Sequence, residues 1–383
     1  MRIFIIGGGF AGVYVAKKLN RLAKKGHEVC LIDKNSYTTM LPNLPEIAGG
    51  KLIGYDITER IVTLIPKRVK FINEEVKEID LNTKAITTTT NNYTYDYLVL
   101  ATGSVTNFYN FNQNLDKVNV LESLDSAEML YEKFLKYIED RQVLNIVISG
   151  AGFTGIELGC NLYDLSKKMG KEVKVSFIEK ANKILPMLSG KLSNYANKKM
   201  DEMDFKIYKD HEIQEFDVEK IILNKGEVIE DVFFSWCSGV KSSLMPIGEY
   251  NKLYDGRIIV NKDLSLAKYN KVFVVGDAAA VKDRDGVFLR RGVNFAQMEG
   301  ACVAKNIIND INGKQRKEFK AIDLGWVIPI YSSSIGVAFG KDIKGRLGIF
   351  MHYIICGIKN YNFKNFCKEF CAAVKYPFTK RPR

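Results

Sequence analysis

The first 33 residues constrain the fold more than any other stretch of this chain. An apolar, β-branched run at residues 2–6 is typical of a buried parallel strand, and it leads into a G-x-G-x-x-G turn at residues 7–12. A helix with regularly spaced apolar positions follows, and then a second strand that ends in the carboxylate of Asp33. This order, with an acidic residue about 20 positions after the last glycine, is the pattern of a dinucleotide-binding β-α-β unit.

Each part of the turn has a physical role. Gly7 lets the chain turn sharply, Gly9 has no Cβ to obstruct a pyrophosphate, and Gly12 lets the helix pack closely on the strand. The helix N-terminus offers free N–H groups to phosphates, and the carboxylate can accept hydrogen bonds from a ribose. We therefore predict a first nucleotide site formed by Gly7, Gly9, Phe10, Ala11, Gly12, Asp33 and Lys34.

A second copy of the pattern begins near the middle of the chain. Residues 144–149 form a strand, residues 150–155 repeat the glycine turn, and a returning strand ends at Glu179. A carboxylate there favours the free 2′-hydroxyl of NADH and repels the 2′-phosphate of NADPH, although Lys180 and Lys183 lie close by in the sequence. The second nucleotide site is predicted at Gly150, Gly152, Phe153, Thr154, Gly155, Glu179 and Gly239.

Two further strands end in residues suited to a ligand. One stops at Ala101, Thr102 and Gly103, and the other is followed by Gly276 and Asp277. Ligands of open parallel sheets bind at the carboxyl ends of strands, and a carboxylate there can accept hydrogen bonds from a polyol chain. Taken alone, the first could be an ordinary turn, and Asp277 could equally cap the N-terminus of a helix.

Composition excludes several classes of protein. With 383 residues, 46% of them hydrophobic, the chain can form cores for two or three domains. No apolar stretch approaches the ~20 residues that span a bilayer, and we expect no signal peptide. The seven cysteines form no C-x-x-C pair and are expected to be reduced in the cytosol, and the three histidines form no zinc set. The net charge of +12 suggests anionic partners, but we find no nucleic-acid-binding motif.

The order of these motifs over residues 1–310 resembles the FAD/NAD(P)-dependent pyridine nucleotide oxidoreductases. The resemblance implies FAD on the first domain, with Asp33 at its ribose and Asp277 at its ribitol, and a nicotinamide nucleotide on the second. The expected fold is α/β, with two Rossmann-type dinucleotide-binding domains, one inserted in the other, and a C-terminal amphipathic helical membrane dock. The predicted boundaries are 1–110 and 256–325 for the FAD domain, 111–255 for the NADH domain and 326–383 for the dock.

Within that superfamily the chain looks most like the type II NADH dehydrogenases, which pass electrons from NADH through FAD to a membrane quinone. There is no cysteine between Cys30 and Cys160, residues 294–304 resemble the family's Ala-Gln quinone-site helix, and residues 348–360 resemble its docking helix. The resemblance implies that Gln297 faces the quinone beside the flavin, and that Glu157 lies near the nicotinamide and flavin. Two positions depart from the family pattern, because Ala301 replaces a second glutamine and Glu299 replaces a small residue.

The C-terminus carries two apolar stripes at helical spacing, flanked by basic residues. The first consists of Leu347, Phe350, Met351, Ile354, Ile355 and Ile358, and the second spans residues 363–374. Such helices lie in anionic membrane interfaces, or they pack on a core or in a dimer. The resemblance favours peripheral attachment to the cytoplasmic face of the membrane, with NADH and quinone as partners, no nucleic acid, and a homodimer left open.

Three other functions remain open at this level. A sulfide:quinone oxidoreductase would use cysteines near the flavin, for which Cys160 and Cys356 are candidates, although Cys160 falls inside the second glycine-turn helix. A soluble reductase would dock an acidic iron–sulfur protein on the basic surface. A redox-sensing flavoprotein would bind NAD(H) and act through partners with slow turnover.

Overall fold

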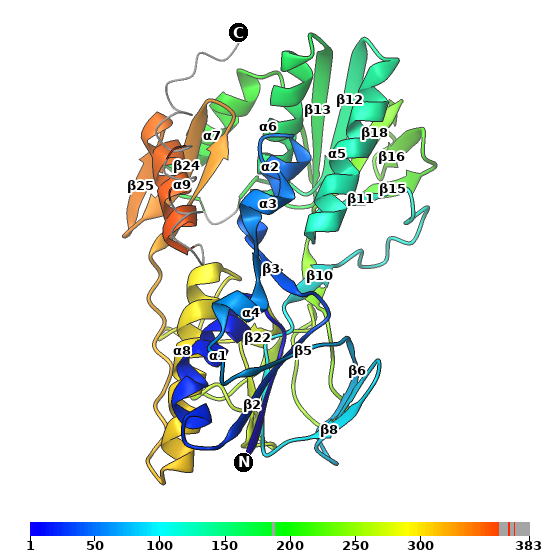
Figure 1. Cartoon of the computed structure of the whole chain (residues 1–383). Coiled ribbons are helices and arrows are strands. Elements are labelled where there is room, and N and C mark those ends of the chain that lie inside the picture. The colour runs from blue at the N-terminus through cyan, green and yellow to red at the C-terminus, as the bar shows by residue number, and fades with distance from the viewer. Residues whose placement is uncertain (186–187, 360–366, 368–370, 372–383) are drawn as a thin grey trace. The chain divides into compact units, whose positions relative to one another are not determined.

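Two parallel β-sheets organise the chain, and each is the centre of its own unit (Figure 1). The computed structural model describes residues 1–185, 188–359, 367 and 371. Unit 1 comprises Met1–Thr39, Thr58–Val105 and Val240–Asp323, and unit 2 comprises Met40–Ile57, Thr106–Gly239 and the described part of Leu324–Arg383. The chain therefore passes between the two units five times.

The sheet of unit 1 has the strand order β21-β9-β1-β2-β5. Its strands are β1 (Arg2–Ile6), β2 (Glu28–Asp33), β5 (Lys70–Asn73), β9 (Tyr97–Leu100) and β21 (Val272–Val274). Every residue of β9 and β21 is buried, as expected for strands covered on both faces. Two helices that pack against each other, α1 (Phe10–Ala23) and α8 (Val293–Ile311), lie beside this sheet.

Smaller elements complete unit 1. They are β3 (Tyr37–Thr39), β4 (Thr58–Arg60), α4 (Ile61–Leu64), β6 (Val76–Asp80), β7 (Ala85–Thr88), β8 (Asn92–Thr94), β19 (Val240–Ser242), β20 (Ile258–Ile259), η2 (Gly276–Ala278) and β22 (Ala279–Ala280). Strand β10 (Ser104–Thr106) pairs with β19 where the chain leaves the unit. The short strands β6, β7 and β8 form an antiparallel sheet.

The sheet of unit 2 has the order β11-β18-β12-β13-β14. Its strands are β11 (Asn119–Val120), β12 (Val143–Ser149), β13 (Glu172–Glu179), β14 (Lys206–Lys209) and β18 (Val232–Trp236). Helices α5 (Leu124–Glu139) and α6 (Phe153–Lys168) pack on it. The Ser123 hydroxyl accepts a hydrogen bond from the Ser126 N–H and fixes the start of α5.

The remaining elements of unit 2 surround this sheet. They are η1 (Leu41–Asn43), α2 (Leu44–Ala48), α3 (Gly54–Ile57), α7 (Gly190–Asp201), β15 (Ile213–Phe216), β16 (Lys220–Leu223), β17 (Val228–Glu230), β23 (Gly325–Ile330), β24 (Ser333–Ala338) and β25 (Lys341–Lys344). Helix α2 packs on α6. Strands β23, β24 and β25 form an antiparallel sheet.

Helix α9 (Arg346–Lys359) packs on β23 and β24. Its buried side carries Ile349, His352, Tyr353 and Cys356. The predicted apolar stripe lies on the more exposed side, where Leu347 is 66% and Ile358 is 68% exposed. Apart from Cys367 and Cys371, the second predicted stripe lies outside the described residues. Within the described part of the chain, no helix has the length and apolar character needed to cross a bilayer.

Candidate functional site

The glycine turn of unit 1 is held by main-chain hydrogen bonds between β1 and its two neighbours. The Gly7 N–H donates to the Ile32 carbonyl at 2.8 Å, and the Ala101 N–H donates to the Ile6 carbonyl at 2.8 Å. Gly7 has a φ of +104°, and a Cβ there would overlap the Ala101 carbonyl, so only glycine fits. Gly12 is equally restricted, because its Cβ would overlap the carbonyl of Gly7.

Asp33 closes this turn. One carboxylate oxygen accepts the Gly8 N–H at 2.5 Å, and the other accepts the Asn35 N–H at 2.7 Å. Burial raises the pKa of Asp33, and these two backbone hydrogen bonds oppose the rise. Lys34 follows at the end of the strand, where its carbonyl accepts a hydrogen bond from Asn73 at 2.9 Å.

The glycine turn of unit 2 repeats this arrangement bond for bond. The Gly150 N–H donates to the Ile178 carbonyl at 2.8 Å, and Gly150 has a φ of +94°. The carboxylate of Glu179 accepts the Ala151 N–H at 2.9 Å and the Ala181 N–H at 2.8 Å. Each acidic side chain thus bonds the second residue of its turn and the residue two positions after itself.

The strand ends beside the two turns also correspond. The Cys237 N–H donates to the Ser149 carbonyl at 2.8 Å, as Ala101 does to Ile6. Cys237, Ser238 and Gly239 therefore stand in unit 2 where Ala101, Thr102 and Gly103 stand in unit 1. The Ser238 hydroxyl hydrogen-bonds that of Ser149, and Gly239 has a φ of +142°. The sequence repeat is therefore also a structural repeat.

Both helices that follow the turns leave room at their N-termini. Gly9 and Gly152 are the N-cap residues of α1 and α6, and no side chain caps either helix. A Cβ on either glycine would have no atom within 4 Å. The ring of Phe153 packs at a tilt against that of Trp326, with ring centroids 4.3 Å apart, and Thr154 is exposed. An uncapped helix start with open space in front of it suits a phosphate group.

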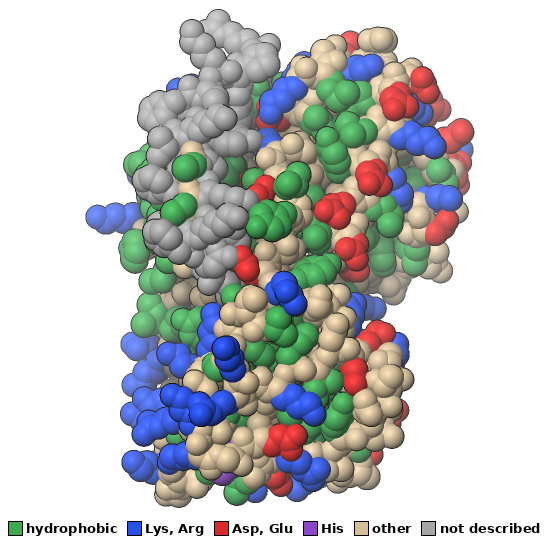
Figure 2. Space-filling model, viewed as in Figure 1, with side chains coloured by type: hydrophobic (Ala, Val, Ile, Leu, Met, Phe, Trp, Pro, Cys, Tyr) green, Lys and Arg blue, Asp and Glu red, His purple; other side chains and the backbone are tan. Residues whose placement is uncertain are grey.

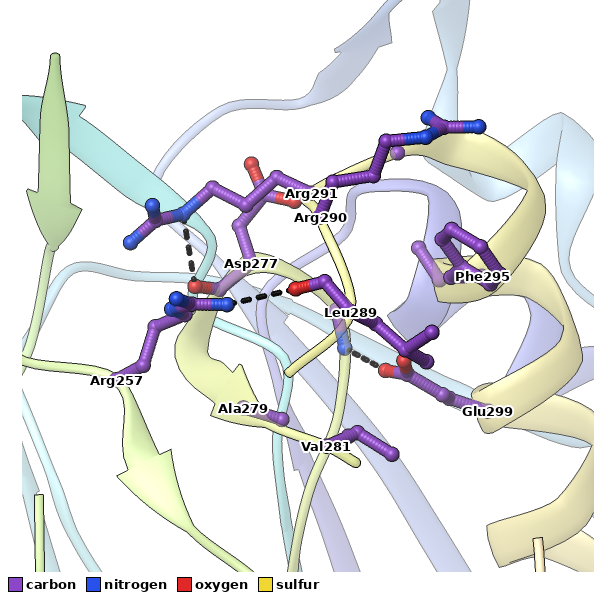
Figure 3. Close-up of a pocket in the computed structure, with 12 residues that line it drawn as sticks. Arg257, Asp277, Ala279, Val281, Leu289, Arg290, Arg291, Phe295 and Glu299 are labelled. Atoms are coloured by element: carbon purple, nitrogen blue, oxygen red, sulfur yellow. Dashed lines mark hydrogen bonds between the residues drawn. The ribbon is translucent and has the colours of Figure 1, made fainter. Parts of the chain in front are cut away.

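A pocket lies at the carboxyl end of β21, where η2 carries Gly276 and Asp277 (Figure 3). The Ser104 hydroxyl donates to the Asp277 carboxylate at 3.0 Å, and the Arg291 guanidinium donates to the Asp277 carbonyl at 3.3 Å. Burial raises the pKa of Asp277, while Ser104, Arg291 and Arg257 oppose the rise. The side chain thus bonds a neighbouring strand rather than capping a helix.

Glu299 of α8 also lines this pocket, and it was not among the residues predicted to form a site. The Gly276 N–H donates to its carboxyl at 2.6 Å, and the side chain is only 3% exposed (Figure 3). Burial, together with the charge of Asp277, raises the pKa of Glu299 to about 8. With a pKa of about 8, the Glu299 carboxyl holds a proton at neutral pH.

Two buried donors near these residues have no hydrogen-bond partner among the residues that the structure describes. They are the Thr102 hydroxyl, which follows β9, and one terminal nitrogen of Arg291. The rest of Arg291 is held in place, because its other terminal nitrogen donates to Asp255 at 3.2 Å. Buried polar groups normally find partners, so these two donors indicate that unit 1 is built to hold a polar ligand.

Gln297 lies on α8 but points away from the side that lines the pocket. Phe295, Ala296 and Glu299 line the pocket, and Gln297 is half-buried on another face of the helix. Its amide makes no hydrogen bond with any described side chain or backbone group. Gln297 belongs to unit 1, whereas Glu157 belongs to unit 2.

Glu157 lies on α6 in a polar cluster inside unit 2. Burial raises its pKa to about 8, the positive field of His352 opposes the rise, and the carboxylate of Glu46 adds to it. Glu46, on α2, is buried and accepts a hydrogen bond from Asn43 at 2.6 Å. The structure thus brings carboxyls from two helices and an imidazole from a third into one cluster.

His352 was missed by the sequence reasoning. Its Nδ1 lies 2.8 Å from the Val327 carbonyl, which can only accept, so Nδ1 carries the proton. The other ring nitrogen, Nε2, lies 3.8 Å from the Cys356 thiol one helical turn later. The i, i+4 spacing of His352 and Cys356 was visible in the sequence, but the pairing with Val327 was not.

Three comparisons relate the chain to known proteins. A family model described as pyridine nucleotide-disulphide oxidoreductase matches residues 1–301. The type II NADH:quinone oxidoreductase of Staphylococcus aureus (strain NCTC 8325 / PS 47) is 30% identical over 382 residues, covering 92% of this chain and 94% of that protein. The protein of the same name from Staphylococcus haemolyticus is 31% identical, with the same coverage.

Solved structures share the fold. NDH2 from Plasmodium falciparum in complex with NADH matches with a TM-score of 0.85, at 17% identity, over 100% of this chain and 99% of that one. The sulfide:quinone oxidoreductase of Aquifex aeolicus matches with a TM-score of 0.76, at 19% identity, over 99% and 96%. At these identities the structural likeness concerns the α/β architecture.

Proposed function

Because this chain belongs to the pyridine nucleotide-disulphide oxidoreductases, and within them to the type II NADH:quinone oxidoreductase family, we propose that it is an FAD-dependent enzyme that oxidises NADH and reduces a membrane quinone. The observation that carries the proposal is the pair of glycine turns with the same hydrogen-bond pattern. Two such turns provide one site for the flavin nucleotide and one for the nicotinamide nucleotide.

FAD fits the residues of unit 1. The open space at Gly9 admits a pyrophosphate, the N–H groups of Phe10 and Ala11 begin the helix, and the partnerless Thr102 hydroxyl offers a buried donor. Asp33 would hold the ribose and Asp277 the ribitol, with Gly7, Gly12, Lys34, Ala101, Gly103 and Gly276 shaping the path between them. Arg291 positions Asp277 through the main-chain carbonyl.

NADH fits the residues of unit 2 in the same way. The open space at Gly152 admits its pyrophosphate, and Glu179 would accept the ribose hydroxyls. Lys180, which could have attracted a 2′-phosphate, forms an ion pair with Glu212 at 3.0 Å. Gly150, Phe153, Thr154, Gly155 and Gly239 surround this site. The charge at Glu179 supports NADH rather than NADPH.

When bound, FAD accepts a hydride from NADH and passes the electrons on, which is chemistry that no side chain here supplies. The chain's residues orient the ligands and handle protons. Reduction of a quinone to a quinol consumes two protons, and Glu157 holds a proton up to a pH of about 8 because burial raises its pKa. We infer that Glu157 serves the reacting rings with a proton and that the amide of Gln297 binds the quinone head group.

The surface of α9 supports peripheral attachment to a membrane. Leu347 and Ile358 are largely exposed, and Phe350, Met351, Ile354 and Ile355 between them are half-buried. An apolar stripe at the surface of a helix is typical of segments that lie in the interface of a bilayer. We infer attachment at the cytoplasmic face of the membrane, where α9 brings the enzyme to its lipid-soluble acceptor.

The first test follows flavin absorbance in two steps. FAD-loaded protein is mixed anaerobically with NADH, and then with a soluble quinone analogue. We expect fast bleaching and fast recovery, and Gln297→Ala should slow only the recovery, whereas Gln315→Ala, an exposed control, should slow neither. Bleaching without recovery on quinone would refute the acceptor and favour a soluble carrier or a redox sensor. No bleaching by NADH would refute the donor.

One observation favours a second candidate function, sulfide:quinone oxidoreduction. The Cys356 thiol lies 3.8 Å from His352 Nε2, and an imidazole can take the proton of a neighbouring thiol to leave a thiolate. Both thiols are buried, Cys356 at 6% and Cys160 at 3% exposure, but Cys160 packs in the apolar core of unit 2. Bleaching of the flavin by sulfide that is lost in Cys356→Ala and kept in Cys160→Ala would support this candidate. Equal bleaching in both variants would exclude Cys356 as the nucleophile.

A further inference from the structure

The positive charge of the chain is concentrated in unit 1. Unit 1 contains 28 Lys and Arg against 18 Asp and Glu, a net charge of +10. Unit 2 contains 28 against 26, a net charge of +2. Almost the whole excess of +12 therefore belongs to the unit that carries the first glycine turn, so it cannot be attributed to the basic C-terminus alone.

Much of this charge lies on one surface, made by α1, α8 and residues 312–323. α8 lies between its two neighbours, because Gly300 faces α1 while Asn306 and Asn309 on the other side donate to the carbonyls of Lys317 and Gln315. Figure 2 shows Lys and Arg side chains gathered where Figure 1 draws these segments. The exposed members, here called the basic face, are Lys18, Arg21, Lys24, Lys25, Lys305, Lys314, Lys317 and Lys320.

These cations are not neutralised by neighbouring carboxylates. None of the eight forms an ion pair with a residue that the structure describes. The acidic residues of the same region are already paired with other cations: Asp263 and Asp310 bond Arg316 at 3.1 and 2.7 Å, and Glu318 bonds Lys262 at 3.4 Å. The basic face therefore keeps its full positive charge.

Local structure explains only part of this face. Arg21 and Lys24 lie in the last turn of α1 and at its C-cap, where cations favour the helix dipole. The dipole does not account for Lys314, Lys317 and Lys320, which lie in an extended segment without regular secondary structure. Unpaired cations on three adjoining segments are typical of a surface that meets an extended anion.

The composition of the face favours lipid headgroups over nucleic acid. Seven of its eight members are Lys, which acts as a hydrated point charge, and residues 17–25 and 305–320 expose no large aromatic side chain on which bases could stack. Ile322, which is 58% exposed, follows the last lysine and offers an apolar contact at the edge. A lysine-rich surface with an apolar edge matches the headgroup region of an anionic bilayer.

We propose that the basic face of unit 1 binds anionic phospholipid headgroups, as a contact separate from the apolar stripe of α9. This inference rests on the proposed function, because the quinone is dissolved in the membrane. The α9 stripe supplies a contact that does not depend on lipid charge, whereas the basic face makes binding depend on anionic lipid and on salt. The two contributions can therefore be separated by experiment.

The test compares two variants of the full-length, FAD-loaded protein. The first replaces Lys18, Arg21, Lys24 and Lys25 by Gln, and its matched control replaces Lys133, Lys136, Lys174 and Lys191, which are exposed lysines of unit 2. Sedimentation with vesicles of phosphatidylcholine, with or without phosphatidylglycerol, measures binding over a salt series. Each cation near an anionic surface strengthens binding roughly fivefold, so we expect at least a ~10-fold loss for the first variant and little change for the control.

A second face variant, Lys314→Gln with Lys317→Gln and Lys320→Gln, guards against misfolding of α1 and should show the same loss. The proposal would be overturned if wild type and both face variants bound vesicles equally, or if the control lost as much binding as the face variants. It would also be overturned if wild-type binding were the same with and without phosphatidylglycerol. Lys18, the first substituted residue of α1, lies about 13 Å along the helix from Gly9. The face variants should therefore reduce a soluble quinone analogue at the wild-type rate. Failure of the wild type to reduce that analogue would refute the proposed function without affecting the vesicle result.

Discussion

At the scale of single residues, Glu299 and Glu157 are two acidic side chains whose pKa burial raises to about 8. Glu299 is almost fully buried and bonded to Gly276, whereas Glu157 is half-buried in a cluster with His352 and Glu46. A buried acid whose pKa is raised stabilises the folded state at low pH. That contribution is lost as the pH rises from about 4.5 through about 8, because the folded protein holds the proton longer than the unfolded chain does.

Replacing Glu299 by Gln should therefore flatten the pH dependence of stability. The amide keeps the shape and can still accept the Gly276 N–H, but it cannot ionise. Between pH 6 and about 8, the loss of unfolding free energy with rising pH should be smaller in the variant by up to ~1.4 kcal/mol per pH unit. The measurement is the midpoint of urea unfolding at each pH, followed by the rise in fluorescence as FAD is released. The variant Glu132→Gln, at an exposed position, serves as the control. An unchanged slope in Glu299→Gln would show that the carboxyl is already charged in the folded protein.

Glu179 should control the choice between NADH and NADPH. In the proposed site its charge would face the 2′-substituent, while Lys180 is paired with Glu212. Two like charges a few ångströms apart near a protein surface repel by a few kcal/mol, so Glu179→Gln should raise the NADPH to NADH ratio of kcat/KM by at least about tenfold. Glu172→Gln, at the other end of β13, serves as the control. An unchanged ratio of kcat/KM would mean that the 2′-substituent does not lie next to Glu179.

At the scale of elements, the same glycine-to-valine substitution should have different effects in the two β-α-β units. Gly9 and Gly152 have extended backbone angles that valine tolerates, and a Cβ on either meets no atom within 4 Å. Valine should therefore leave each fold intact and fill the space proposed for a pyrophosphate. Gly9→Val should lose FAD, whereas Gly152→Val should keep FAD and raise the KM for NADH by at least about tenfold.

Flavin absorbance per protein and an NADH titration measure these two outcomes. Gly190→Val is the matched control, because Gly190 also has open space around it and lies at the start of α7. Loss of FAD in both turn variants, or in neither, would contradict the assignment of one nucleotide to each turn.

Elements with local signals were predictable, and contacts between distant segments were not. The glycine turns and β12 follow from spacing and turn chemistry, and the structure confirms them. The bonds from Gly276 to Glu299 and from His352 to Val327 join segments far apart in sequence, and no periodic pattern encodes such pairs. Strands β23–β25 were also missed, because β23 contains a proline, β24 contains two serines and a glycine, and β25 has only four residues, so that none shows a clear alternation.

At the scale of the whole molecule, two units with separate sheets should respond separately to ligand. A ligand that binds only the folded state stabilises the unit that binds it, in proportion to the logarithm of its concentration over its Kd. We expect FAD removal to lower the melting temperature of unit 1 more than that of unit 2, and excess NADH to protect unit 2. Calorimetry of apo and loaded protein measures this. A single transition that FAD shifts as a whole would mean that the five crossings make the two units one cooperative body.

Those five crossings also fix the order in which a growing chain can fold on the ribosome. Every strand of the parallel sheet of unit 2 is synthesised before β21 and α8 emerge. Until then β9 lacks its outer neighbour and the apolar side of α1 lacks α8, so the first segments made are among the last to be buried. FAD can be captured only by a nearly finished polypeptide, and a chain stalled before residue 272 would present an open strand edge and an apolar helix to chaperones and proteases.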